Sequence, residues 1–89
     1  MEKGRNHCIA GVHVRDRVGH ISEVQDIFTE FGCFIKTRIG LHDINDNSCS
    51  PGGLIIVEFM GNENEFGKFI SQLGDVEGVE VQSMVFKHI

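Results

Sequence analysis

The fold is decided by residues 12–32, VHVRDRVGHISEVQDIFTEFG. An alternating apolar run ends at Val14, and a short polar turn that contains Asp16 and Gly19 follows it. Apolar residues then recur at spacings of 3, 4 and 3, which is typical of one helical stripe: Ile21, Val24, Phe28 and Phe31. Gly32 is expected to end the helix in the left-handed conformation that glycine tolerates best. The stretch therefore predicts a strand, a tight turn and a helix over roughly residues 18–31, the first half of a βαβ unit.

Alternating apolar residues predict the strands that surround this helix. Over residues 6–14 they face one side, while the residues between them face the other: Cys8, Ala10, Val12 and Val14 against His7, Ile9, Gly11 and His13. Residues 33–42 predict a second strand, with Ile35, Thr37, Ile39 and Leu41 sharing a face. Turn-forming residues over 43–52, which include the only proline, predict a loop. Residues 53–60 predict a third strand, and alternation resumes at Val79 for a fourth.

A second helix is predicted between the last two strands. Asn62 and Glu65 have the spacing of a capping box. The apolar stripe that follows consists of Phe66, Phe69, Ile70 and Leu73, and Gly74 is expected to end the helix. Gly67 lies inside the helix, where glycine costs roughly 1 kcal/mol relative to alanine, and therefore predicts close packing against the sheet.

The predicted order of elements is β-α-β-β-α-β, and a weak internal repeat supports it. Residues 23–32 overlay residues 65–74 in one register, with glycine on glycine at the end. Two βαβ halves with right-handed crossovers form a ferredoxin-like plait, an α+β fold whose four-stranded antiparallel sheet carries both helices on one face. We expect residues 1–5 to be a flexible N-terminus and residues 6–89 to be a single domain.

The charge and cysteine content exclude several classes of function. The 89 residues include 13 acidic and 8 basic side chains, for a net charge of −5. Phosphate binding needs clustered Lys and Arg, so direct binding to nucleic acid is not expected. No apolar run approaches the roughly 20 residues of a membrane span, and residues 1–6 lack the apolar core of a signal sequence. Three irregularly spaced cysteines form no disulfide pattern, which favours a reduced, cytoplasmic protein.

Only one side of such a sheet is covered by its own helices. The other side is expected to carry an apolar patch with charged residues among them, which usually marks an interface: Ile9, His13, Arg38, Leu54, Ile56, Glu58, Met84 and Phe86. A charge pair between His13 and Glu58 is one expectation, because their strands should be adjacent. The alternative is a strand register shifted by one residue, which would shrink the patch. We expect a homodimer or homotetramer, because a domain of this size buries little surface alone.

The turn before the first helix resembles a known family. Residues 16–24, DRVGHISEV, are similar to the ACT-domain signature, in which an Asp-Arg-Pro-Gly turn leads into a Leu-x-x-Val helix, with Val18 in place of proline. Residues 37–40, 53–60 and 72–81 resemble more closely the regulators of the iron-only hydrogenase system. These regulators resemble ACT domains and the C-terminal domain of the nickel-responsive regulator.

This resemblance implies an oligomeric regulator, acting on transcription through partners, that binds a small effector at a subunit interface. In ACT domains the effector lies near the turn between the first strand and helix, where backbone N–H groups suit a carboxylate. Carried over to this sequence, the site consists of Asp16, Val18, Gly19, His20 and Ile21. The alternative is that Asp16 only caps the helix and Gly19 only makes the turn.

A metal site is the second implication. His42, Asp43 and Cys49 bracket the loop after the second strand, where the nickel-responsive regulators bind metal, and imidazole and thiolate suit nickel or zinc. The His-x-His pair of that family is absent, so a closed site would need a further histidine from a symmetry-related chain: His7, His13 or His88. The alternative is a polar loop with a stray thiol.

Catalysis is not expected, and neither is a bound cofactor. The sequence has no motif around a Cys–His or Ser–His pair, no phosphate-binding glycine loop and no paired carboxylates at a strand end. Cys8 and Cys33 are expected to be inert thiols of the core or of strand edges. Three hypotheses therefore remain: a regulatory effector-binding module, a metal-responsive protein and a structural assembly subunit.

Overall fold

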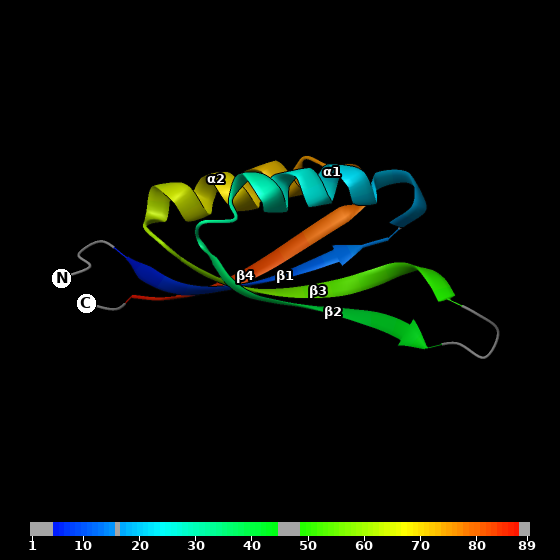
Figure 1. Cartoon of the computed structure of the whole chain (residues 1–89), viewed down its shortest axis with the longest axis horizontal. Helices are drawn as coiled ribbons and strands as arrows, with labels where there is room; N and C mark the ends of the chain where they lie inside the picture. The colour runs from blue at the N-terminus through cyan, green and yellow to red at the C-terminus, as the bar shows by residue number, and fades with distance from the viewer. Residues whose placement is uncertain (1–4, 16, 45–48, 88–89) are drawn as a thin grey trace.

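The structure is a computed structural model that describes residues 5–15, 17–44 and 49–87, and for residues 17–19, 41–44 and 49–52 it describes the backbone only. The elements are β1 (Asn6–Val14), α1 (Arg17–Glu30), β2 (Ile35–Ile44), β3 (Cys49–Gly61), α2 (Glu63–Gly74) and β4 (Val79–Phe86). The strands form one antiparallel sheet in the order β2-β3-β1-β4, and both helices lie on the same face of it (Figure 1). The predicted ferredoxin-like βαββαβ fold is confirmed.

The central strand β1 has the predicted alternation. It pairs with β3 on one side and with β4 on the other, and Ala10 lies opposite Val57 and Ser83. Cys8, Ala10 and Val12 are fully buried beneath the helices. His7, Ile9, Gly11 and His13 lie on the other face of the sheet, because successive side chains of a strand point to opposite faces.

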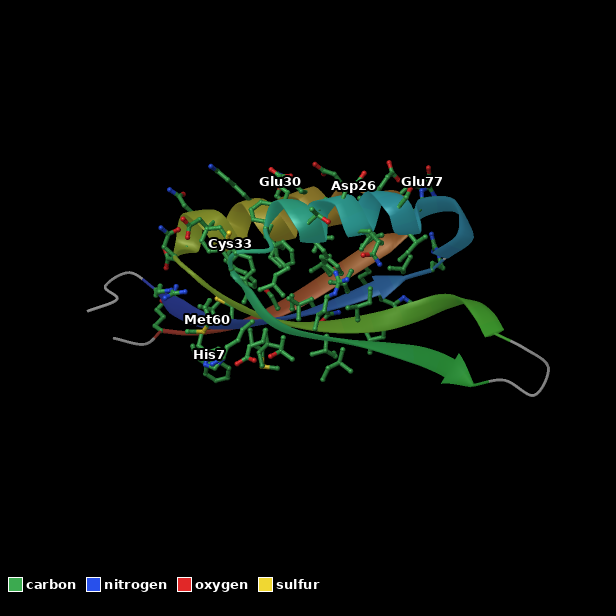
Figure 2. The ribbon with its side chains drawn as sticks, in the orientation of Figure 1. His7, Asp26, Glu30, Cys33, Met60 and Glu77 are labelled. Carbon is green, nitrogen blue, oxygen red and sulfur yellow. The ribbon has the colours of Figure 1, made fainter. Side chains whose placement is uncertain are left out.

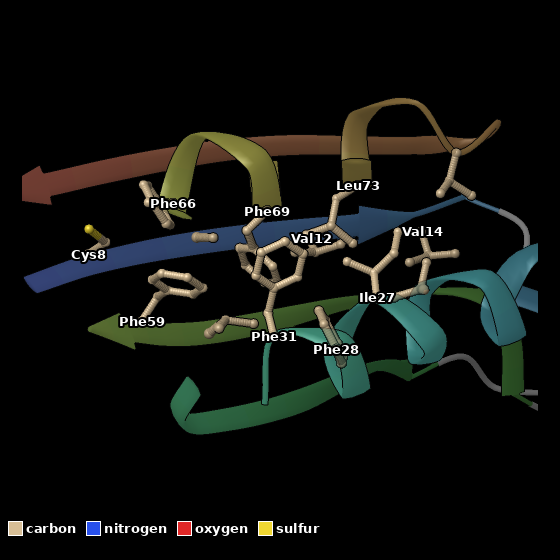
Figure 3. Packing of buried hydrophobic residues seen from close by; sticks show 14 residues of the cluster. Cys8, Val12, Val14, Ile27, Phe28, Phe31, Phe59, Phe66, Phe69 and Leu73 are labelled. Carbon is tan, nitrogen blue, oxygen red and sulfur yellow. The ribbon is translucent and has the colours of Figure 1, made fainter. Parts of the chain in front are cut away.

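The core beneath the helices is built mainly from phenylalanine rings. Phe59 of β3 lies at its centre, with its ring centroid 4.9 Å from Phe69 and 5.1 Å from Phe66 on α2 (Figure 3). Phe31 of α1 approaches the same group, 5.4 Å from Phe69. The predicted helical stripes supply these rings, and Asn62 and Glu65 form the predicted capping box. Aromatic burial of this kind supplies much of the stability of a small domain.

The glycines behave differently from the sequence-based expectations. Gly32 is not left-handed, because the chain leaves α1 through successive right-handed turns in which Gly32 N donates to Thr29 O. Among the described residues, only Gly78 has a positive φ, at 83°. Gly67 is exposed, and a Cβ built on it would meet nothing within 4 Å, so the expected close packing there is wrong.

The hairpin between β2 and β3 is longer than predicted. Residues 43–52 were expected to be a loop, but β2 continues to Ile44 and pairs there with Cys49. An irregularity in register between His42 and Ile44 accommodates the extra residues of β3. Pro51 is thereby included in a strand, which a proline tolerates at such irregular or edge positions.

A bulge in β2 reverses the face predicted for Arg38. Ile35 pairs with Phe59, but Thr37 pairs with Glu58, so Lys36 is an extra residue in the ladder. One extra residue exchanges the two faces for every position that follows. Thr37 and Ile39 therefore lie on the uncovered face, and Arg38 lies on the helix side, opposite Val57. The prediction that Arg38 belongs to the uncovered patch is wrong for this reason.

Candidate functional site

The uncovered face of the sheet is the largest candidate surface. Among its described side chains, the most exposed apolar ones are Ile39, Met84 and Phe86, which are 52%, 57% and 50% exposed. Between them lie half-buried side chains from the central strands: Ile9, Leu54, Ile56 and Met60. An apolar surface that extends over all four strands is uncommon on a monomer and usually marks an interaction site.

Gly11 lies at the middle of this uncovered face. In the sheet register it is opposite Ile56 of β3 and Gln82 of β4. A Cβ on Gly11 would meet only Gln82 O, at 3.9 Å, so the position is open. The uncovered face therefore has a shallow centre, with the apolar Ile56 on one side and the polar Gln82 on the other.

A polar cluster of Glu58, His7 and Thr37 lies on the same face. Thr37 Oγ1 donates to Glu58 Oε1 at 2.8 Å, and His7 Nε2 donates to Glu58 Oε2 at 2.5 Å. The hydrogen bond from Thr37, followed by the one from His7, lowers the pKa of the Glu58 carboxyl below its usual value. Figure 2 shows His7 on the side of the sheet away from the helices. Both carboxylate oxygens of Glu58 therefore accept a hydrogen bond.

The charge pair predicted between His13 and Glu58 is not formed. Glu58 lies opposite Ile9 in the register, whereas His13 lies opposite Leu54 and Glu80. Four residues of β1 separate the two levels, about 13 Å at the usual rise per strand residue. His7 takes the expected role, because it is diagonal to Glu58 across β1 and β3. Alternation alone identifies all these residues as sharing a face, but it cannot choose between two histidines without the register.

The turn predicted around Gly19 is part of the helix, because α1 already begins at Arg17. Asp16 lies outside the described residues, as does the side chain of Val18. His20 Nδ1 lies 3.1 Å from Glu23 Oε1 on the same helix. Ile21 is partly buried and packs against the core, which gives it a structural role.

The start of α1 packs against the turn between α2 and β4. Arg15 N donates to Gly78 O at 2.8 Å. A Cβ on Gly78 would lie 3.6 Å from His20 Cδ2. The predicted effector site is therefore bordered by this second turn, which the sequence did not connect with it.

The side chains of the predicted metal ligands lie outside the described residues. The backbone of the hairpin brings Cys49 opposite Ile44, two residues from His42. Within the described part of the chain, no three His, Cys, Asp or Glu side chains are grouped as a metal site would require. Of the histidines predicted as donors, His7 bonds Glu58 and His13 is exposed, whereas His88 lies outside the described residues.

The two described cysteine side chains differ in environment. Cys8 is fully buried, and burial raises the pKa of its thiol, so it is an inert core residue as predicted. Cys33 is exposed in the turn after α1, so the prediction of a core or strand-edge position is wrong for it. The described helices are also too short or too polar to cross a lipid bilayer.

Sheet order, antiparallel pairing and two helices on one face define the protein as a small α+β domain of the ferredoxin-like class. No family model and no curated protein matches the sequence. Among solved structures, the chain is similar to an uncharacterized protein from Thermotoga maritima, with 20% identity and a TM-score of 0.82 over 93% of this chain and 99% of that one.

Two further solved structures have the same fold. The C-terminal domain of the MgtC protein from Mycobacterium tuberculosis is 9% identical, with a TM-score of 0.68 over 99% of this chain and 95% of that one. A nitrogen regulatory PII-like protein from Thiomonas intermedia K12 is 12% identical, with a TM-score of 0.50 over 93% and 92% of the two chains. At these identities the similarity shows the fold alone.

Proposed function

We propose that this protein is a small homo-oligomeric regulatory module that binds a small effector at a subunit interface and acts through partner proteins, without catalysis of its own. The uncovered sheet face carries this proposal. Met84 and Phe86 are each at least half exposed on it, beside the apolar side chains of the central strands. A second copy packed on this face would remove that apolar surface from water, which is the main driving force of association.

The uncovered face also suits self-pairing in its polar groups. Glu58 is already bonded to Thr37 and His7 within one chain, so a second copy would not need to supply partners for its carboxylate. Buried charges are tolerated at interfaces when they are paired and hydrogen-bonded in this way. The open centre at Gly11 would accept a side chain from the facing copy.

The self-association test compares two neighbours on β4. Met84 lies on the uncovered face and Ser83 on the helix side, and both are exposed. Sedimentation velocity and light scattering should give a dimer or tetramer for the wild type and for Ser83→Lys, and a monomer for Met84→Lys. A wild type that stays monomeric at high concentration, or a loss of assembly in Ser83→Lys alone, would overturn the proposal.

The proposed effector site consists of Asp16 and the first residues of α1: Val18, Gly19, His20 and Ile21. Its support is the resemblance to ACT domains together with the helix N-terminus at which these residues lie. The PII-like protein of Thiomonas intermedia, which shares the fold, has been solved with ADP, AMP and bicarbonate bound. The resemblance to regulators of the iron-only hydrogenase system also suggests that the regulated process is transcription in such a system. The cysteine content favours the cytoplasm as the location.

A thermal-shift screen with amino acids and small carboxylates tests the effector site. A ligand at 100 times its Kd should stabilise the fold by about 2.7 kcal/mol. The shift should disappear in Asp16→Ala and persist in Glu30→Ala, an exposed change at the opposite end of α1. If no compound changes the melting temperature, the structural assembly subunit becomes the better hypothesis.

Metal response is the second candidate function. The hairpin register favours it, since it brings the backbone of Cys49 close to that of His42. Protein purified without chelator should then contain nickel or zinc, and a His42→Ala/Cys49→Ala variant should not. Metal absent from both proteins, or equal in both, would rule the site out.

A further inference from the structure

A groove of about 360 Å³ lies between the C-terminal half of α1 and the beginning of β2. Its volume is within the range of small-molecule sites. The lining combines two cations, an apolar wall and two threonines whose hydroxyl groups already donate to Gln25 O and Glu58 Oε1: Phe28, Thr29, Gly32, Ile35, Lys36, Thr37 and Arg38. No acidic residue lines it, although the chain as a whole carries a net charge of −5.

Arg38 is held in place at this groove. Its guanidinium carbon lies 5.0 Å from the centroid of the Phe28 ring, and its Nη2 donates to Gln25 Oε1 at 3.4 Å. A guanidinium has five N–H donors, of which this contact uses one. Stacking on the ring limits the rotamers of Arg38, so a planar anion would meet a partly ordered fork.

The bulge in β2 brings the second cation to the same groove. Lys36 is the extra residue of the ladder, and Arg38 faces the helix side because of it. Lys36 also lowers the pKa of Glu58, so part of its charge acts toward the uncovered face. Arg38 is therefore the stronger of the two candidate contacts for an anion.

The acidic side chains near the groove either point away from it or are hydrogen-bonded, as Glu58 is to Thr37 and His7. Asp26 and Glu30 of α1 point away from the sheet, toward the outer side of the helix (Figure 2). Two carbonyl groups in the last turn of α1 are occupied, since Ile27 O accepts from Phe31 N and Thr29 O accepts from Gly32 N. The negative end of the helix is thus partly neutralised where the groove begins.

We propose that this groove binds a small organic anion through a carboxylate or phosphate group. Arg38 would contact two of its oxygens, Lys36 would add a point charge, and Phe28 with Ile35 would contact its apolar part. The groove lies at the opposite end of α1 from the proposed effector site, mainly on the helix side of the sheet at the edge formed by β2. It is therefore a site beyond the proposed function and does not depend on self-association.

The test titrates the full chain with phenyl phosphate and with benzoate at constant ionic strength, followed by ¹H–¹⁵N NMR spectra. Amide shifts should concentrate in residues 28–38, and the tighter of the two ligands identifies phosphate or carboxylate as the preferred group. Charge-assisted hydrogen bonds contribute about 1.5–3 kcal/mol, so Arg38→Gln should weaken binding by about tenfold or more. Lys36→Gln should weaken it less.

Two further variants keep the test decisive. Arg38→Lys retains the charge but loses the planar fork, so it should also bind more weakly than the wild type. Lys68→Gln makes the same charge change as Lys36→Gln at an exposed position of α2 and should leave the affinity unchanged. The proposal fails if neither ligand shifts these amides, or if Lys68→Gln weakens binding as much as Arg38→Gln does.

Discussion

The two faces of the sheet are built by the same strands and reach opposite states of burial. On the helix side, Val57 and Phe59 of β3 are fully buried. On the other side, Ile56 and Glu58 of the same strand remain partly exposed. Each strand therefore presents side chains to two faces of the sheet, but the two helices cover only one of them.

The helix side of the sheet provides the stability of the fold, and the uncovered face provides the candidate interaction surface. On the helix side, contacts between α1, α2 and the sheet are complete within one chain, and the only described buried polar residue is Asn6. The uncovered face keeps its polar cluster and its most exposed apolar side chains. Substitutions on the helix side should act on folding, and those on the uncovered face should act on assembly.

The largest expected effect comes from the centre of the core. Phe59→Ala should lower the free energy of unfolding by about 3–5 kcal/mol, because it leaves a cavity among Phe31, Phe66 and Phe69. Ile56→Ala, three residues earlier on the other face, should cost much less at low protein concentration. Urea denaturation of both variants measures the difference, with Phe59→Leu as the milder change if Phe59→Ala does not fold. Equal losses would show that the faces do not differ in this way.

Substitutions of two glycines, one against the core and one on the surface, should change the free energy of unfolding by intermediate amounts of opposite sign. A Cβ on Gly61 would lie 2.8 Å from Phe59 Cε1 and 3.1 Å from Glu65 Oε1, so Gly61→Ala should overpack the core. We expect a loss of about 1–3 kcal/mol. Gly67→Ala, on the exposed side of α2, should instead stabilise by about 0.5–1 kcal/mol, because alanine is the better helix former and nothing obstructs its Cβ.

Thermal unfolding of both glycine variants checks these opposite signs. A stable Gly61→Ala would mean that Phe59 shifts without cost, which its full burial makes difficult. A destabilised Gly67→Ala would indicate a contact at that surface, such as a partner over the neighbouring groove between α2 and β4.

Local patterns predicted most of the fold because each rests on a period that the sequence displays. Alternation in β1 and the apolar stripe of α2 correspond to the observed buried positions. Arg38 was assigned to the wrong face because the bulge at Lys36 changes the parity of one strand, and no residue type marks such a bulge reliably. The predictions of a left-handed Gly32 and of close packing at Gly67 were wrong for a related reason, since glycine permits special conformations and close contacts without requiring them.

The candidate sites were harder to predict because they depend on register and on contacts between distant elements. His7, and not His13, reaches Glu58, which only the pairing of β1 with β3 decides. The groove that Arg38 and Phe28 line was missed altogether, because it follows from the same bulge. A stacked Arg–Phe pair ten residues apart has no signature in a single sequence.

The smallest expected effect is a pH dependence confined to the uncovered face. The hydrogen bond from Thr37, followed by that from His7, lowers the pKa of Glu58 in the folded protein, so the folded state favours the carboxylate. Its contribution to stability is therefore present above the ordinary carboxyl pKa of about 4.3 and is lost as the pH falls through the lowered value. Glu58→Gln should accordingly be less stable than the wild type at pH 7, and the difference should shrink in acid.

Urea denaturation at neutral and at acidic pH measures this change, with Glu77→Gln as the control. Glu77 is exposed and lies away from the uncovered face, as Figure 2 shows, so its substitution should leave the pH profile of the wild type unchanged. A Glu58→Gln profile parallel to that of the wild type would mean that the polar cluster contributes nothing to folding. No described residue of the core is charged, so the core itself adds no pH dependence. If the pH profile of stability changes with protein concentration, the polar cluster of Glu58, His7 and Thr37 takes part in assembly.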